Sequence, residues 1–101
     1  MMFKIDCNNR MTVTKGDRAF INFRCANYKL KEGDSVILTI WDGERAIVTK
    51  QDDNFTEEGF ICIELDAEDT NQSIKEYDYT IRVVTPNGID ETVIKNILNV
   101  I

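Results

Sequence analysis

The chain has 101 residues, 43% of them hydrophobic and 30% charged, a composition typical of a globular domain and unlike that of a disordered or fibrous chain. Its 12 basic and 18 acidic side chains give a formal net charge of -6, which disfavours nucleic acid and anionic membranes as partners. No apolar run approaches the roughly 20 residues that span a bilayer, and the N-terminal residues lack the apolar stretch of a signal peptide, so we expect a single domain over residues 1–101 that is made and kept in a cytoplasm.

Alternating apolar and polar side chains predict β-strands along most of the chain. Short candidates at residues 3–7 and 11–14 precede a clear alternating run at 18–25. Residues 35–42 (SVILTIWD) alternate too, but carry apolar side chains on both faces. A strand with two covered faces is typical of the middle of a sheet, so we expect this one to be central.

The second half of the chain continues the pattern, with predicted strands at residues 46–50, 59–65 and 77–84. Residues 91–101 (ETVIKNILNVI) fit a helical stripe as well as a strand. Their β-branched content and the turn ahead of them favour a strand. Strands at these intervals, without a long helix between them, indicate an all-β sandwich or barrel.

Four dipeptides that contain glycine lie between these strands and predict turns: Gly16-Asp17, Gly33-Asp34, Asp42-Gly43 and Asn87-Gly88. The first two stand before alternating runs, where glycine supplies the positive φ of a tight reversal. The last two are favoured centres of two-residue hairpins, and the single proline, Pro86, lies in the second of them. The polar stretch at 66–73 predicts a crossover between sheets, with a single helical turn capped by Asp66 or Asp69.

Few residues in this chain suit catalysis or metal binding. Histidine is absent, and the three cysteines, Cys7, Cys25 and Cys62, lack zinc-site spacing. We expect them to be small, buried or half-buried strand residues in a reducing compartment. Acidic side chains cluster at Asp52, Asp53, Glu57 and Glu58, and again at Glu64, Asp66, Glu68 and Asp69. Paired carboxylates in these clusters could serve acid–base chemistry, but such runs are more typical of solvated loops. The second cluster could offer oxygen ligands to calcium, but it lacks the alternating Asp/Asn ligands and the glycine of an EF-hand loop. We therefore expect no enzyme activity, no catalytic residue, no metal and no cofactor.

Aromatic side chains are the remaining candidates for a function. Trp41 and Phe20 could anchor a partner if they are exposed, although a two-layer sheet that buries them is the simpler expectation. Tyr77 and Tyr79 open a late strand, where sandwiches often keep a tyrosine whose ring packs in the core while its hydroxyl bonds nearby backbone. The tripeptide at residues 15–17 (KGD) matches an adhesion motif, but it stands where a hairpin needs Gly-Asp, so we interpret it as a turn.

Four segments, taken in order, resemble a known family: MTVTKGDRAFINF (11–23), EGDSVILTI (32–40), GFICIELDAEDT (59–70) and YDYTIRVVTPNGIDETVI (77–94). Their Gly-Asp turns, Asp-Thr pair, Tyr-x-Tyr strand and Asn-Gly hairpin resemble the small immunoglobulin-like domains of tailed-phage and prophage structural proteins of Gram-positive bacteria, including the N-terminal domains of baseplate upper proteins. The resemblance implies an immunoglobulin-like β-sandwich of about seven to eight short antiparallel strands.

The resemblance also implies a non-enzymatic virion protein of the tail or baseplate that acts through protein–protein assembly contacts. Its partners would be other phage structural proteins and further copies of itself, and it would pass from the bacterial cytoplasm into the virion tail. The alternative from the residues is a carbohydrate-binding or adhesion module, in which Trp41, Phe20 and a loop acid form the site.

Overall fold

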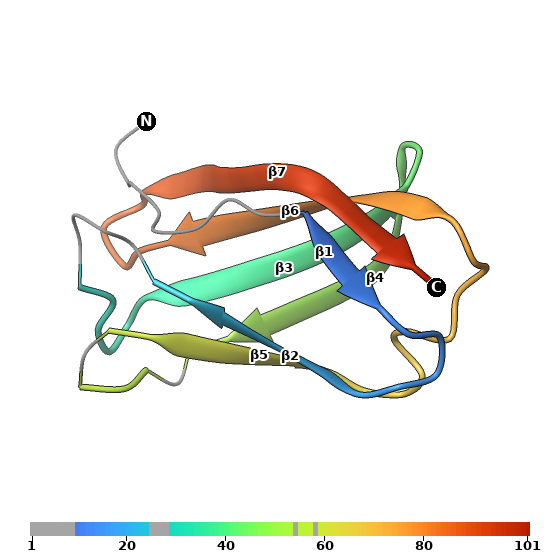
Figure 1. Ribbon diagram of the computed structural model, residues 1–101. Helices are drawn as coiled ribbons and strands as arrows, with labels where there is room; N and C mark the ends of the chain where they lie inside the picture. The colour runs from blue at the N-terminus through green and yellow to red at the C-terminus, as the bar shows by residue number, and fades with distance from the viewer. Residues whose placement is uncertain (1–9, 25–28, 54, 58) are drawn as a thin grey trace.

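The computed structural model describes residues 10–24, 29–53, 55–57 and 59–101, and in these ranges all regular secondary structure is β (Figure 1). The strands are β1 (Met11–Val13), β2 (Ala19–Phe23), β3 (Ser35–Asp42), β4 (Arg45–Asp52), β5 (Ile61–Leu65), β6 (Glu76–Val84) and β7 (Asp90–Val100). They form a five-stranded sheet in the order β1-β7-β6-β3-β4 and a two-stranded sheet of β2 and β5. The all-β prediction is confirmed, while the candidate strand at 3–7 lies outside the described residues.

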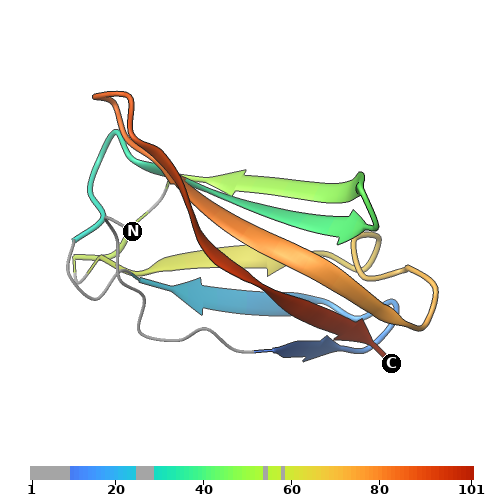
Figure 2. The ribbon, with the colours of Figure 1, turned by 90° about the horizontal axis from the view of Figure 1, so that it is seen from above.

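The two sheets face each other and enclose one apolar core (Figures 1 and 2). On β5, Ile61, Ile63 and Leu65 are buried while Cys62 and Glu64 are exposed, which is the alternation that the sequence predicts. On β6 the buried side chains are those of Tyr77, Tyr79, Ile81 and Val83. These two strands thus contribute every second side chain to the space between the sheets.

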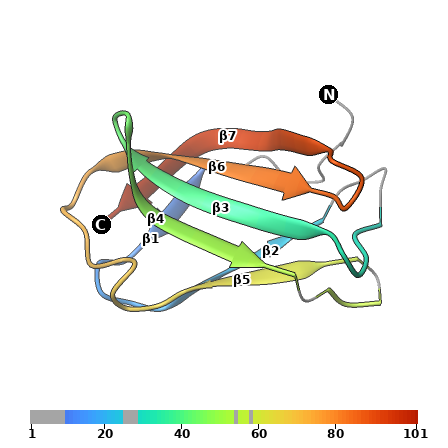
Figure 3. The ribbon, with the colours of Figure 1, turned by 180° about the vertical axis from the view of Figure 1, so that it is seen from behind.

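The strand β3 is central, as its sequence predicts, because β4 and β6 flank it (Figure 3). Val36, Leu38 and Ile40 point into the core and are almost completely buried. On the opposite, outer face of the sheet, Thr39 is also buried and Trp41 is half-buried. Apolar character on both faces of this strand therefore reflects a core on one side and a partly buried outer face on the other.

Residues 90–100 form β7, so the strand interpretation of the last segment is confirmed and the helical alternative is wrong. The pairing of β6 with β7 shifts register between Ile81 and Arg82, which leaves Val93 as an additional residue on β7. This bulge lets the consecutive side chains of Val93 and Ile94 both enter the core. The bulge explains why an inward-facing strand carries the adjacent apolar pair that also fits a helix.

The first described strand departs from the expected antiparallel arrangement, because β1 pairs in parallel with β7. The Lys15 N–H donates to the Ile101 carbonyl at 2.9 Å, and the Ile101 N–H donates to the Val13 carbonyl at 2.9 Å. Parallel neighbours need a long connection, and here nearly the whole domain separates the two strands. Alternation within one strand carries no information on the direction of its neighbour, so the sequence pattern could not show this.

Both predicted hairpins exist, but their centres differ from the expected two-residue pairs. Asp42 pairs with Arg45, so the loop between β3 and β4 is Gly43-Glu44, with Gly43 at a φ of 64°. Positive φ at the first loop residue alone is the pattern of a type II′ turn. Between β6 and β7 the Thr85 N–H donates to the Ile89 carbonyl, which leaves a three-residue loop.

The connection from β5 to β6 contains the predicted helical turn. The Asp66 carboxylate accepts the Asp69 N–H at 2.9 Å, and the Asp69 carboxylate accepts the Asp66 N–H at 2.9 Å. The Thr70 N–H then donates to the Asp66 carbonyl. This reciprocal capping confirms Asp66 as the cap of a single turn.

Candidate functional site

The two aromatic residues singled out from the sequence lie on opposite sides of the molecule. Phe20 is on β2 between Ala19 and Ile21, which pack against the core, so its own side chain points outward and is 61% exposed. Trp41 is on the outer face of the five-stranded sheet, one residue beyond the buried Ile40. The expectation that both are buried is wrong for Phe20, and the core between the two sheets prevents them from sharing one site.

The outer face of β2 and β5 combines exposed aromatic rings with arginines. Phe20 lies opposite Glu64, and Asn22 lies opposite Cys62. The Arg18 guanidinium sits 5.7 Å from the centre of the Phe20 ring and also forms an ion pair with Glu64. We call the set Arg18, Phe20, Asn22, Arg24, Phe60, Cys62 and Glu64 the β2–β5 face.

Phe60 and Arg24 extend the β2–β5 face beyond the paired residues. The Arg24 guanidinium lies 4.9 Å from the centre of the Phe60 ring, which is 36% exposed. Cation–π contacts of this kind contribute about 0.5–1 kcal/mol at exposed sites. Phe60 lies in the strand predicted at residues 59–65, on the face opposite Ile61 and Ile63, but it was not among the sequence candidates.

The outer face of the five-stranded sheet is hollowed beside Trp41. A groove of about 450 Å³ is lined by Trp41, Gly43, Asp78, Thr80, Thr92 and Lys95. The Trp41 Nε1–H donates to the Thr80 hydroxyl at 3.0 Å, which holds the indole against β6. We call this the Trp41 groove. The sequence signal for its other residues is only their outward position on alternating strands.

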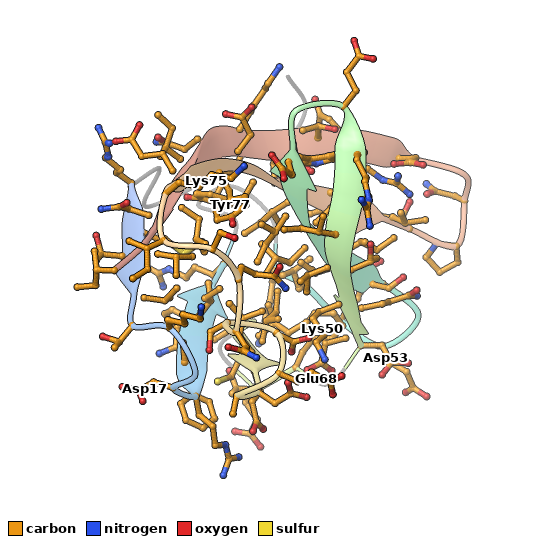
Figure 4. The ribbon with its side chains drawn as sticks, turned by 90° about the vertical axis from the view of Figure 1, so that its right-hand side faces the viewer. Asp17, Lys50, Asp53, Glu68, Lys75 and Tyr77 are labelled. Atoms are coloured by element: carbon orange, nitrogen blue, oxygen red, sulfur yellow. The ribbon has the colours of Figure 1, made fainter. Side chains whose placement is uncertain are left out.

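The acidic cluster after β5 engages backbone and lysine, which leaves little of it for a cation. The Lys50 ammonium lies 2.8 Å from the Asp69 carboxylate and 3.7 Å from that of Asp66. The hydrogen bond to Asp69 raises the pKa of Lys50, and the Asp69 backbone N–H lowers the pKa of Asp66. In the described part of the chain, no three carboxylate or cysteine side chains converge to hold a metal ion. Figure 4 labels Lys50 and Glu68, which lie in the lower part of that view.

The KGD tripeptide is held as a turn. The Asp17 N–H donates to the Thr14 carbonyl at 3.0 Å, and Gly16 adopts a φ of 81°. The buried Thr70 fixes this turn from the crossover, because its hydroxyl donates to the Asp17 carbonyl at 2.6 Å. The KGD residues therefore have a structural role: they form the turn between β1 and β2 and bind it to the connection between β5 and β6.

Tyr77 behaves as its position predicts. Its side chain is 4% exposed, and its hydroxyl donates to the Ser73 carbonyl four residues upstream at 2.7 Å. The Lys75 ammonium lies 5.2 Å from the centre of the ring and pairs with Asp42 at 2.8 Å, which raises the pKa of Lys75 (Figure 4). This is the tyrosine corner that immunoglobulin-like sandwiches use to fix the entry to a strand.

The cysteines give a mixed result. Cys62 is a free thiol on β5, so its place on a strand is as expected, but its side chain is exposed and the expectation of a buried or half-buried residue is wrong for it. Cys7 and Cys25 lie outside the described residues. Tyr79, two residues after the corner tyrosine, occupies the position at which antibody domains carry the second cysteine of their inter-sheet disulfide, and its ring is buried in the core.

The comparisons with known proteins bear on the fold alone. No protein-family model matches the sequence, and no curated protein matches it. Among solved structures, murine CRIg matches with a TM-score of 0.50 and 14% identity, covering 96% of this chain and 94% of the other. Together with the strand order, this likeness shows that the chain has an immunoglobulin-like β-sandwich fold. In the ranges that the structure describes, no helix has the length and apolarity needed to cross a membrane.

Proposed function

We propose that the chain is a non-enzymatic assembly module of a phage or prophage tail or baseplate, which binds other structural proteins of the particle through the β2–β5 face. The phage assignment rests on the sequence resemblance, and the choice of surface rests on the structure. On this proposal the chain is made in the bacterial cytoplasm and carried into the virion tail.

The exposure of Phe20 and Phe60 on one face carries the assembly proposal. Both rings lie beside an arginine, and aromatic residues with arginine are the side chains most enriched at the centres of protein interfaces. An isolated exposed ring is unremarkable, whereas two on one short sheet are costly to leave in water. A partner that covers both rings would remove this apolar area from water.

The β2–β5 face is small, so on this proposal the particle would have to repeat the contact many times. Five residues per strand and two strands give a surface of roughly 17 by 10 Å, or about 170 Å² in projection. A stable pair of proteins buries about 800 Å² on each side, so this face alone makes a weak contact. Weak contacts become strong when a symmetric particle presents many of them together, which is how a tail or baseplate is built.

The test begins with particles induced from the bacterium that carries the gene. Purified particles are analysed by mass spectrometry for this chain, and its absence from them would refute the phage assignment. The native gene is then replaced by a Phe20→Ser, Phe60→Ser double variant. We expect the double variant to be depleted from particles by about tenfold or more, because two interface anchors are lost together.

The matched control is Ile74→Ser, which removes an exposed apolar side chain from the connection between β5 and β6. We expect it to enter particles as the native chain does. Equal incorporation of the double variant and the control, with both folded by circular dichroism, would show that another surface makes the contact.

A further inference from the structure

The Trp41 groove has the size and lining of a small-ligand site, separate from the β2–β5 face. Its volume of about 450 Å³ falls within the roughly 300–1,000 Å³ of typical ligand pockets. Side chains from three neighbouring strands line it, with Gly43 of the β3–β4 turn at its end. The rigid sheet, and not a loop, therefore sets the positions of its polar groups.

The indole of Trp41 is prepared for stacking. Its Nε1–H is the only polar group of the side chain, and the hydrogen bond to the Thr80 hydroxyl satisfies it. The half-buried ring is thus held in one orientation and offers apolar surface to the groove. Stacking on the ring would therefore not require the Trp41 side chain itself to become ordered, which removes one common cost of binding.

The polar groups of the groove are of complementary kinds. Asp78 supplies an acceptor, Lys95 supplies a donor, and the Thr92 hydroxyl can serve as either. Asp78 lies opposite Trp41 in the register, and Lys95 lies opposite Thr80. Within the described residues, neither Asp78 nor Lys95 forms an ion pair or a hydrogen bond through its side chain, so both remain available to a ligand.

The position and charge of the groove restrict the ligand class. The strands β3 and β6 are paired on both sides, so a peptide could not add to them through backbone hydrogen bonds. One carboxylate and one ammonium give the lining no net charge, and the chain as a whole carries -6, which disfavours polyanions. A neutral molecule with one apolar ring face and several hydroxyls, each able to donate and accept, fits these groups.

We propose that the Trp41 groove binds a neutral pyranose unit of a glycan, with one face of the sugar ring stacked on Trp41 and its hydroxyls bonded to Asp78, Thr92 and Lys95. This site does not depend on the assembly proposal. The two surfaces lie on opposite outer faces of the sandwich, so each can fail its test while the other passes.

The single tryptophan of the chain makes the groove directly observable. The intact chain is first screened on an array that holds neutral oligosaccharides, polyanionic glycans and peptides. The best neutral glycan is then titrated while the fluorescence of Trp41 is recorded. We expect a saturable change in emission, because a sugar stacked on the indole displaces water from it.

Variants of the groove identify the polar contacts. We expect Asp78→Asn and Lys95→Gln each to raise the dissociation constant by about tenfold, since hydrogen bonds to charged groups contribute roughly that factor. Thr92→Val should weaken binding less, and Trp41→Phe should weaken it when measured by calorimetry. The Phe20→Ser, Phe60→Ser variant is the matched control and should bind as the native chain does.

Several results would overturn the proposal. These are the absence of saturable binding to any neutral glycan, binding that the Asp78 and Lys95 variants leave unchanged, and equal weakening by the control variant. A preference for peptides or for polyanionic glycans on the array would also reject it. Circular dichroism of each variant shows that lost binding reflects the groove and not unfolding.

Discussion

The tyrosine corner gives a stability prediction that can be worked out from one hydrogen bond. Tyr77→Phe removes a single hydroxyl and leaves the ring, which is 4% exposed, in place. The lost bond to the Ser73 carbonyl is 2.7 Å long, and a net contribution of about 0.5–1.5 kcal/mol is typical of such bonds. Ser73 is exposed, so water can reach its carbonyl once the hydroxyl is gone. We therefore expect a loss near the middle of that range, about 1 kcal/mol.

Urea unfolding followed by circular dichroism measures this loss. For a domain of this size, about 1 kcal/mol corresponds to a melting temperature lowered by roughly 4–8 °C, while the urea dependence of the free energy should not change. Thr49→Val is the matched control, since it removes a hydroxyl from an exposed strand position, and its effect should stay within about 0.5 kcal/mol. If Tyr77→Phe destabilises no more than the control, the hydroxyl bond does not stabilise the corner.

Three further variants test other parts of the fold. Thr70→Val should cost about 1–2 kcal/mol in urea unfolding, because it removes the 2.6 Å bond to the neighbouring turn, whereas Thr70→Ser keeps the hydroxyl and should retain most of the stability. Gly33→Ala should destabilise more than Gly88→Ala in thermal melts, because both have positive φ but only the first places a Cβ 2.8 Å from Pro86; equal losses would contradict the steric argument. The pKa of Lys50 is raised in the folded state, so the charged side chain stabilises the fold below the ordinary lysine pKa of 10.5. This contribution is lost as the pH rises through the folded pKa. From about pH 10.5 upward, a Lys50→Met chain should therefore lose less stability than the native chain.

The sequence predicts the strands well because one face of each is buried. Alternation placed β3 within its observed bounds, and it identified β7 as a strand despite a competing helical stripe. Turn chemistry located the reversals at Gly16 and Gly33, where the structure has positive φ. Local backbone preferences and burial thus account for the elements, and the resemblance to immunoglobulin-like domains accounts for their arrangement.

Features that depend on pairing between strands were harder to predict. The parallel contact of β1 with β7 joins residues almost ninety positions apart, and no local pattern encodes it. The loop centred on Gly43 differs by one residue from the expected one, because register across the hairpin decides which residues form the turn. The bulge at Val93 has the same origin.

The candidate surfaces were predictable only in part. Trp41 and Phe20 were identifiable as unusual aromatic residues, but a single alternating run does not reveal which of its faces meets the core when both carry apolar side chains. The companions of Trp41 in its groove come from β6 and β7, and only the register of the five-stranded sheet brings them together. Phe60 belongs to the β2–β5 face through its contact with Arg24, which the sequence pattern does not show.

The sandwich separates its two candidate surfaces by a packed core, and this has a testable consequence for how they combine. Stacked sheets lie about 10 Å apart, and substitutions at that separation without shared partners usually add in free energy. A chain that carries Phe20→Ser, Phe60→Ser and Lys95→Gln together should therefore show the incorporation defect of the first pair and the weakened glycan affinity of the third, each of unchanged size. A combined variant whose glycan affinity falls well beyond that of Lys95→Gln alone would mean that the two faces communicate through the core, and that the module is one coupled unit.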